Sequence, residues 1–285
     1  MCFSTLLMEK DMEIRDLVAA TQKYWDDVCN AITAYAAENA RLRKAEQELF
    51  GCESYMVSLR DYPDYKQEDH LKRVAQGLMR HLIEVAVREF SPSAAAPIRI
   101  EDKEIAVAAG CDGNDFRKFN ALTFWTCLES RFGGNQGVET AFRQAGSELV
   151  KVFRIKPEAG IARRKGCIVL DLGVYATNSK WDKRYRLQYG CQETIGRTVR
   201  SLKSFASWAE MLTLQFSLDR LVREFQLGQG YVESRESYTF GNPEDGQIKV
   251  TTFHSRFEFV FDAKVSEKLQ LFLGEYGFTE LAEAA

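Results

Sequence analysis

The fold is decided toward the C-terminal end of the chain, by QGYVESRESYTF (Gln229–Phe240) and QIKVTTFHSRFEFVF (Gln247–Phe261). In both stretches apolar and polar residues alternate, which is the period of a β-strand with one buried face. The NPEDG sequence between them (Asn242–Gly246) has the composition of a hairpin turn. The next stretch, AKVSEKLQLFLGEY (Ala263–Tyr276), returns to a helical period. We therefore expect a small, largely antiparallel sheet with a C-terminal hairpin and a closing helix.

The first third of the chain has a helical period instead. Apolar residues at alternating 3- and 4-residue steps predict one long helix over residues 7–50 and a second over residues 66–90. The apolar seam of the long helix consists of Ile14, Val18, Thr21, Trp25, Val28, Ile32, Tyr35, Asn39, Leu42 and Leu49. We expect the two helices to fold back on each other as a hairpin. The alternative is that the long helix pairs with a second copy of the chain and forms a homodimer.

The SPSAAAP stretch (Ser91–Pro97) is the best candidate for a linker. It predicts a helical arm over residues 1–90 and a mixed domain over residues 98–285, and therefore an α+β protein. In the mixed domain we expect helices over Asp115–Phe132 and Val138–Phe153. A further helical region in two pieces is expected over Gln192–Phe225.

The stretch GCIVLDLGVYA (Gly166–Ala176) reads like the first strand of a methyltransferase. A cofactor loop needs several glycines after the strand, because the backbone must approach the cofactor closely. Here Gly173 is followed by Val174 and Tyr175, which would crowd such a site. We therefore expect no cofactor, and we interpret the stretch as a strand buried on both faces.

Composition excludes several classes of protein. No stretch approaches the run of about 18 apolar residues that spans a membrane, and the start of the chain lacks the basic region of a signal peptide. The seven cysteines include no C-x-x-C pair, which favours reduced, mostly buried thiols in a cytoplasmic protein. None of the three histidines is spaced with cysteines as zinc ligands are, so we expect no metal.

Charge is distributed unevenly along the chain. Residues 151–203 carry 13 Lys and Arg against 4 Asp and Glu, a net charge of +9, whereas the segments before and after it each carry −6. A basic middle of this kind indicates a negatively charged partner such as nucleic acid. The alternative is that the acidic flanks neutralise the basic middle within one molecule.

Cations contact phosphates, and aromatic rings stack on bases. The basic middle enters the central strand with one group of cations, leaves it with a second group that includes a tryptophan, and continues on the following helix. The candidate nucleic-acid-binding residues are Arg163, Arg164, Lys165, Lys180, Trp181, Lys183, Arg184, Arg186, Arg197, Arg200 and Lys203. The last three are spaced to share one face of a helix.

Signs of catalysis are weaker. A metal-dependent nuclease needs clustered carboxylates, and the nearby acids lack an acidic-x-Lys element after the strand; they are Glu148, Glu158, Asp171 and Asp182. Neither G-x-S-x-G nor GK[ST] occurs in the chain. We interpret His254 as a structural residue, and we expect a protein that is not an enzyme.

The C-terminal half resembles a domain family of unknown function that is found on plasmids, phages and genomic islands. The resemblance covers roughly residues 115–275 and rests on four stretches in order: AFRQAGSELVKVF (141–153), ARRKGCIVL (162–170), TFHSRFEFVF (252–261) and VSEKLQLFL (265–273). Residues 253–256 read Phe-His-Ser-Arg, whereas the family has Asn-Gly-Asn and a histidine in this strand. The resemblance implies a mobile-element origin, and it implies no activity or catalytic residue.

These observations leave three hypotheses. The first is a cytoplasmic accessory protein of a phage or plasmid that binds nucleic acid through its basic middle. The second is a protein-binding inhibitor of a host defence system that targets nucleic acid. The third is a divergent metal-dependent nuclease.

Overall fold

The computed structural model describes residues 14–50, 64–110, 116–156, 161, 163–178, 184–227 and 230–278. Its contacts group the chain into two compact units. The helical unit combines residues 1–89 with 100–133, and the mixed unit combines residues 90–99 with 134–285. The segment 100–133 thus packs with the helical arm, although it follows the linker predicted at residues 91–97.

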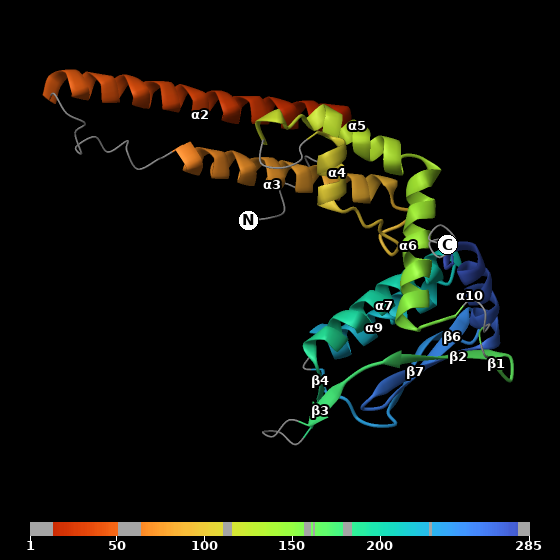
Figure 1. Cartoon of the computed structure of the whole chain (residues 1–285). Coiled ribbons are helices and arrows are strands. Elements are labelled where there is room, and N and C mark those ends of the chain that lie inside the picture. Colours follow the sequence, from red (N-terminus) through yellow and green to blue (C-terminus); the bar gives the residue numbers. More distant parts are fainter. Residues whose placement is uncertain are drawn as a thin grey trace. The chain divides into compact units, whose positions relative to one another are not determined.

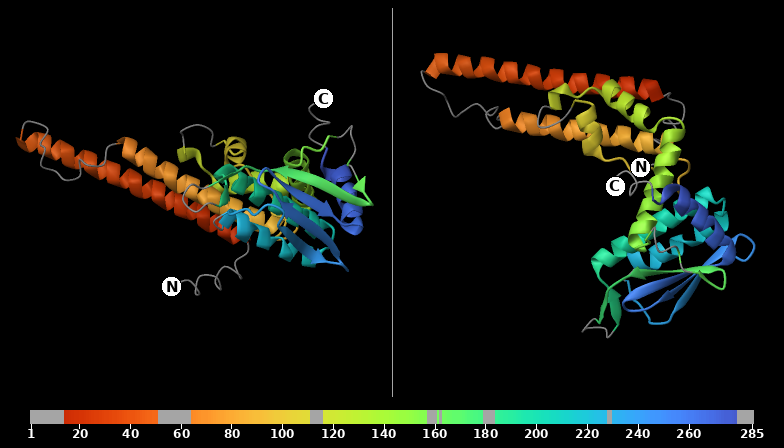
Figure 2. Two further views of the ribbon diagram at one scale, coloured as in Figure 1. Left: turned by 90° about the horizontal axis from the view of Figure 1, so that it is seen from below. Right: turned by 45° about the vertical axis from the view of Figure 1, so that its right-hand side comes forward.

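The helical unit contains four α-helices within the described ranges. These are α2 (Ile14–Phe50), α3 (Asp64–Phe90), α4 (Asp102–Ala108) and α5 (Ala121–Phe132), with a short 3₁₀ turn, η2 (Phe116–Lys118), before α5. The long helices α2 and α3 run roughly parallel to each other in the three views of Figures 1 and 2. The N-terminal part of the predicted seam faces inward, because Val18 and Trp25 are each 2% exposed. At the other end Leu49 is exposed, and pairing of α2 with a second copy stays a prediction.

Helix α5 starts later than the sequence pattern predicts. It begins at Ala121 rather than Asp115 because Asn120 caps it: the Asn120 side chain accepts a hydrogen bond from the Thr123 amide at 2.8 Å. The residues before the cap are used for packing, since the Phe119 ring meets the Trp25 ring edge-on at 5.6 Å. Arg117 ties the same segment to α3 through an ion pair with Glu68 at 2.7 Å.

The mixed unit is built around a five-stranded antiparallel sheet with the order β1-β2-β7-β6-β5. Its strands are β1 (Arg163–Arg164), β2 (Cys167–Gly173), β5 (Ser237–Asn242), β6 (Gly246–Thr252) and β7 (Arg256–Phe261). A separate two-stranded ribbon consists of β3 (Ala176–Asn178) and β4 (Tyr185–Leu187). The helices are α6 (Asn135–Val152), α7 (Tyr189–Trp208), α8 (Leu212–Ser217), α9 (Asp219–Val222), the π-helical turn η4 (Arg223–Leu227) and α10 (Ala263–Tyr276).

This arrangement confirms the predicted α+β class, with its small antiparallel sheet and C-terminal hairpin. The β5–β6 turn is closed by the Asn242 side chain, which accepts a hydrogen bond from the Asp245 amide at 2.6 Å. The stretch 247–261 forms two strands rather than one. It reverses where the Phe253 amide donates to the Arg256 carbonyl at 2.8 Å, so β6 and β7 form a second hairpin.

The buried side chains of the sheet point to one face. On β2, Ile168, Leu170 and Leu172 are buried, whereas Asp171 and Gly173 between and after them are exposed. The expectation that this strand is buried on both faces is therefore wrong. Although its residues are mostly apolar, their burial alternates along the strand, and only one face is covered. The strand belongs to an antiparallel sheet, where one exposed face is common.

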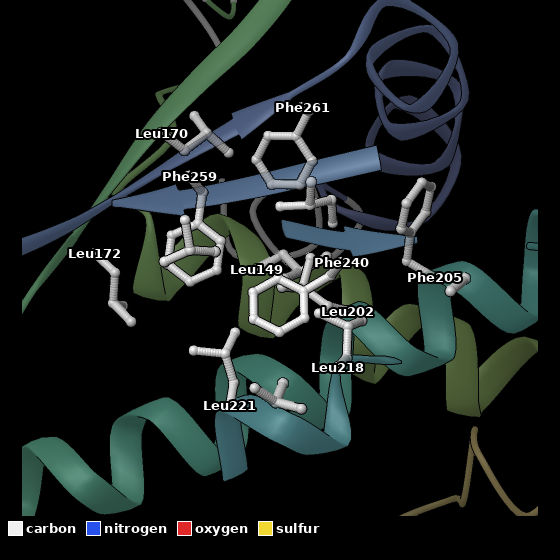
Figure 3. Close-up of a cluster of buried hydrophobic side chains, with 14 of the residues drawn as sticks. Leu149, Leu170, Leu172, Leu202, Phe205, Leu218, Leu221, Phe240, Phe259 and Phe261 are labelled. Carbon is white, nitrogen blue, oxygen red and sulfur yellow. The ribbon is translucent and has the colours of Figure 1, made fainter. Parts of the chain in front are cut away.

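Leucine side chains and phenylalanine rings fill the space between the sheet and its helices (Figure 3). Phe153 at the end of α6 meets Phe259 edge-on at 5.3 Å, and Phe205 of α7 meets Phe272 of α10 at 5.5 Å. Ser266 links α10 to the sheet because its hydroxyl accepts from the Ile168 amide at 2.7 Å and donates to a carbonyl of β7 at 2.9 Å. Ser266 thus holds α10 against the end of the β2–β7 pair where Ile168 and Phe261 lie opposite each other.

Two expectations from composition can be compared with the structure. Among the described residues, no helix is both long enough and apolar enough to span a membrane. The described cysteines are free thiols, but they are half-buried rather than buried; they are Cys29, Cys127, Cys167 and Cys191.

Candidate nucleic-acid interface

The first group of predicted cations lies on the β1–β2 hairpin. Arg163 and Arg164 form the exposed edge strand β1, and Lys165 occupies the turn with a φ of 51°. Gly166 follows with a φ of 82°, so the two-residue turn uses the left-handed region twice. The Arg163 guanidinium donates a hydrogen bond to the Gln270 side chain of α10.

The second group lies at the other end of β2. Arg186 pairs with Thr177 in the β3–β4 ribbon, whereas Arg163 pairs with Ile168 at the start of β2. Nine steps along extended chain separate these two register positions, which is up to about 30 Å. Figure 1 shows β1 and β4 at opposite ends of β2. The structure therefore does not bring the predicted cations into one surface, and Lys180, Trp181 and Lys183 lie outside the described residues.

The three predicted cations of α7 differ in their surroundings. Arg197 is held by Glu148, with Nη1 and Oε1 3.5 Å apart, and Lys203 is held by Asp219, with Nζ and Oδ1 2.7 Å apart. Arg200 is exposed. Glu148 and Asp219 belong to the two acidic segments on either side of the basic middle. At these two positions the acidic flanks therefore neutralise cations of the basic middle within the same molecule.

A different cluster forms where the β3–β4 ribbon meets the turn between β6 and β7. We call it the ribbon site. It combines aromatic rings with arginines from four segments of the chain that lie far apart in the sequence. Its members are Tyr175, Arg184, Tyr185, Arg186, Tyr189, Tyr231, Phe253, His254 and Arg256.

Backbone hydrogen bonds fix these segments against one another. The Ala176 amide donates to the His254 carbonyl at 3.0 Å, which joins β3 to the β6–β7 turn. The Val232 amide donates to the Tyr185 carbonyl at 2.9 Å, which joins β4 to the segment before β5. The Gln188 amide donates to the Tyr175 carbonyl at 3.0 Å. The positions of the rings thus follow from strand pairing and not from side-chain contacts alone.

The rings and guanidinium groups stack in pairs. The Tyr185 and His254 rings are 3.6 Å apart and within 10° of parallel. The Arg184 guanidinium lies over the Tyr231 ring at 5.3 Å, and that of Arg256 lies over the Phe253 ring at 4.7 Å. Cation–π contacts of this kind orient a guanidinium while its edge can still donate to an anion.

Three tyrosines of the ribbon site are exposed to an unusual degree. Tyr175, Tyr185 and Tyr189 are 68%, 36% and 83% exposed, although aromatic side chains usually supply buried apolar surface. Exposed rings beside arginines give a surface that offers both stacking faces and positive charge. Such a surface matches the bases and phosphates of a nucleic acid.

Sequence reasoning found part of this site. It named Arg184 and Arg186 but missed Tyr185, Tyr189 and Arg256, and it interpreted His254 as a structural residue. The local signal was limited to tyrosines in YRLQYG (residues 185–190), and no local pattern indicated that the β6–β7 turn would lie beside them.

The structure describes part of the carboxylate group that was considered for a nuclease. Glu148 is an ion-pair partner of arginines, Asp171 is exposed on β2, and Glu158 and Asp182 lie outside the described ranges. Within those ranges no group of three or more His, Cys, Asp and Glu side chains is placed to hold a metal ion.

Comparison with known proteins identified no relative of this chain. The chain matches no family model, and no curated protein or solved structure is significantly similar to it. Its function therefore has to be argued from the ribbon site and from the charge of the basic middle.

Proposed function

We propose that this protein binds nucleic acid, and that the ribbon site is its principal contact surface. The observation that carries the proposal is that exposed tyrosines and arginines meet at one end of β2, held by backbone hydrogen bonds. The proposal keeps the predicted role of Arg184 and Arg186. It assigns structural roles to Arg197 and Lys203, because acidic side chains already hold them.

The two kinds of side chain have separate tasks in this proposal. Arginines neutralise phosphates and release counterions, which supplies affinity that falls as salt rises. With three arginines in contact, the slope of log K against log salt would be about −2 to −3. The tyrosines add stacking, which depends little on salt and tolerates any base.

The biological setting follows from the resemblance of the C-terminal half. It supports an origin in a phage or plasmid, and within that setting we propose a cytoplasmic accessory protein that acts by binding rather than by catalysis. The hairpin of Arg163, Arg164 and Lys165 would serve as a second, weaker contact for a longer nucleic acid, since it lies up to about 30 Å along the extended chain from the ribbon site.

Fluorescence anisotropy tests the proposal. Labelled single-stranded DNA, duplex DNA and RNA are titrated with the protein at low and high salt. We expect binding that weakens with salt and weakens further in an Arg184→Glu/Arg186→Glu variant. An Arg163→Glu/Arg164→Glu variant should lose less affinity than the Arg184→Glu/Arg186→Glu variant.

The matched control is Arg43→Glu/Arg80→Glu, which makes the same change of charge at two exposed positions of the helical unit. It should bind like the unchanged protein. The absence of binding to all three nucleic acids would overturn the proposal, and so would an equal loss of affinity in the control and the ribbon-site variant.

A second candidate function is inhibition of a host protein. Tyrosine and arginine are also the residues that dominate the energy of protein–protein interfaces, and the ribbon site exposes both. Flat anisotropy traces, together with capture of a host nucleic-acid-processing protein that the Tyr185→Ala variant fails to capture, would favour this function.

A further inference from the structure

We infer that the ribbon site takes unpaired bases, and that one base extends the Tyr185–His254 stack. The inference rests on the proposed function and names the class of its ligand: a single-stranded stretch of nucleic acid rather than a duplex. It is carried by the geometry of this ring pair.

The Tyr185–His254 pair has the geometry of a base stack. Its ring centroids are 3.6 Å apart and its planes differ by 10°, so a planar base added to the pair would continue the same stack. Tyr185 keeps 36% of its surface exposed. In a duplex the faces of the bases are covered by their neighbours, and only an unpaired base presents a face to a side chain.

The pair is held in place before any ligand arrives. The His254 carbonyl accepts from the Ala176 amide at 3.0 Å, and the Tyr185 carbonyl accepts from the Val232 amide at 2.9 Å. The tight turn from Phe253 to Arg256 fixes the histidine from its other side. Because the rings are ordered in advance, less side-chain entropy is lost when a base stacks on them.

Arginines adjoin both members of the ring stack along the chain. Arg256 lies two residues from His254 in the chain, and its guanidinium lies over the Phe253 ring at 4.7 Å. Arg184 and Arg186 alternate with Tyr185 along the chain, so they point to the opposite face.

Further rings lie along the same ribbon. Tyr175 is bonded through its carbonyl to the Gln188 amide, next to Tyr189, and both tyrosines are more exposed than Tyr185. Gln188 is three residues from Tyr185, a distance of about 10 Å in extended chain. A ligand that reaches all three tyrosines therefore spans more than one nucleotide.

Three labelled 12-nucleotide ligands test the inference with the full-length protein. These are a single strand, a duplex of the same sequence, and a single strand whose central positions are abasic, which keeps the phosphates and removes the bases. We expect the single strand to bind about 5- to 150-fold more tightly than the abasic strand, which is the range for losing one stacked base. The duplex should bind no better than the abasic strand.

Variants of Tyr185 locate the effect. Tyr185→Leu should lower the affinity for the single strand about tenfold and change the affinity for the abasic strand little. Tyr185→Phe keeps the ring and should retain the affinity of the unchanged protein. Tyr24→Leu, at an exposed aromatic residue of the helical unit, is the matched control. Circular dichroism confirms that each variant is folded.

The possible results separate the inference from the proposed function. Equal affinity for the single strand and the abasic strand, or tighter binding of the duplex, overturns the inference and leaves salt-dependent nucleic-acid binding in place. Unchanged single-strand affinity in Tyr185→Leu also overturns it. Absence of binding to every ligand overturns the proposed function itself.

Discussion

Arg256 Nε lies 3.4 Å from Asp171 Oδ1, diagonally across the central strand pair β2–β7. Directly opposite Asp171 in this pair is Glu258, which has the same charge. Like charges in opposite positions destabilise a sheet, and Arg256 offsets this repulsion. The same contact engages an arginine of the ribbon site, so Asp171 competes with any phosphate that Arg256 would bind.

Replacing Asp171 by Asn should therefore tighten nucleic-acid binding. The gain should be about two- to fivefold, because an exposed ion pair is worth about 0.2–1 kcal/mol. Anisotropy titrations at low salt measure it. Glu267→Gln, an equal change of charge on the exposed side of α10, controls for the change in net charge. An affinity that falls in Asp171→Asn would contradict a phosphate role for Arg256.

Replacement of Arg197 should lower stability, whereas replacement of Arg186 should lower the affinity for nucleic acid. The Glu148 side chain is only 10% exposed and lies between Arg197 and Arg99, so Arg197→Ala leaves a nearly buried carboxylate with one arginine. We expect the free energy of unfolding to fall by about 1–3 kcal/mol with little change in affinity for nucleic acid. Arg186→Ala should weaken binding and change stability by less than about 0.5 kcal/mol.

Urea unfolding and anisotropy on the same two variants give the comparison. If Arg197→Ala loses affinity while its unfolding midpoint stays constant, α7 belongs to the interface and the structural role assigned to Arg197 is wrong.

Because α6 packs closely against α10, replacement of Gly146 should destabilise the mixed unit. A Cβ atom at this position would lie 2.8 Å from the Tyr276 carbonyl, and backbone cannot move aside cheaply. We expect Gly146→Ala to destabilise the mixed unit by about 1–3 kcal/mol. Gly77→Ala on α3 is the matched control, because its Cβ would meet nothing within 4 Å, and it should stabilise its helix by about 0.5–1 kcal/mol.

Hydrogen exchange resolved by peptide assigns each effect to its own unit. Faster exchange in α6 and α10 is expected for Gly146→Ala, and slower exchange in α3 for Gly77→Ala. Unchanged exchange in α10 of the Gly146→Ala protein would show that the two helices are less closely packed than this geometry requires.

Trp25 should anchor the helical unit. It is 2% exposed, and its ring packs edge-on against Phe119 at 5.6 Å. Truncation to Ala should lower the free energy of unfolding of this unit by about 3–5 kcal/mol, as for other buried aromatic residues. The adjacent Tyr24 is 54% exposed, and Tyr24→Ala should cost less than about 0.5 kcal/mol. Similar losses for both variants, measured by exchange in α2, would contradict this packing.

Local patterns in the sequence determined the secondary structure and the class of the fold. Steps of 3 and 4 residues predicted the long helices, and the NPEDG turn predicted the hairpin between β5 and β6. Alternation predicted extended chain over residues 247–261, but not the turn that divides it into β6 and β7. These features depend on neighbours within a few residues, so they can be read without knowledge of the fold. The start of α5 was misplaced because the capping residue Asn120 follows a segment that packs by its own side chains.

The tertiary structure alone decided where the site lies. His254 and Tyr185 come from turns and strands far apart in the chain, and they meet only because β7 pairs with β2 and the ribbon follows the end of β2. In the same way, long-range packing placed Arg197 and Lys203 beside acids and left Arg184 and Arg186 on an exposed ribbon. Composition indicates that a charged surface exists, but only strand register decides which side chains form it, since shifting a strand by one residue reverses the side on which every side chain lies.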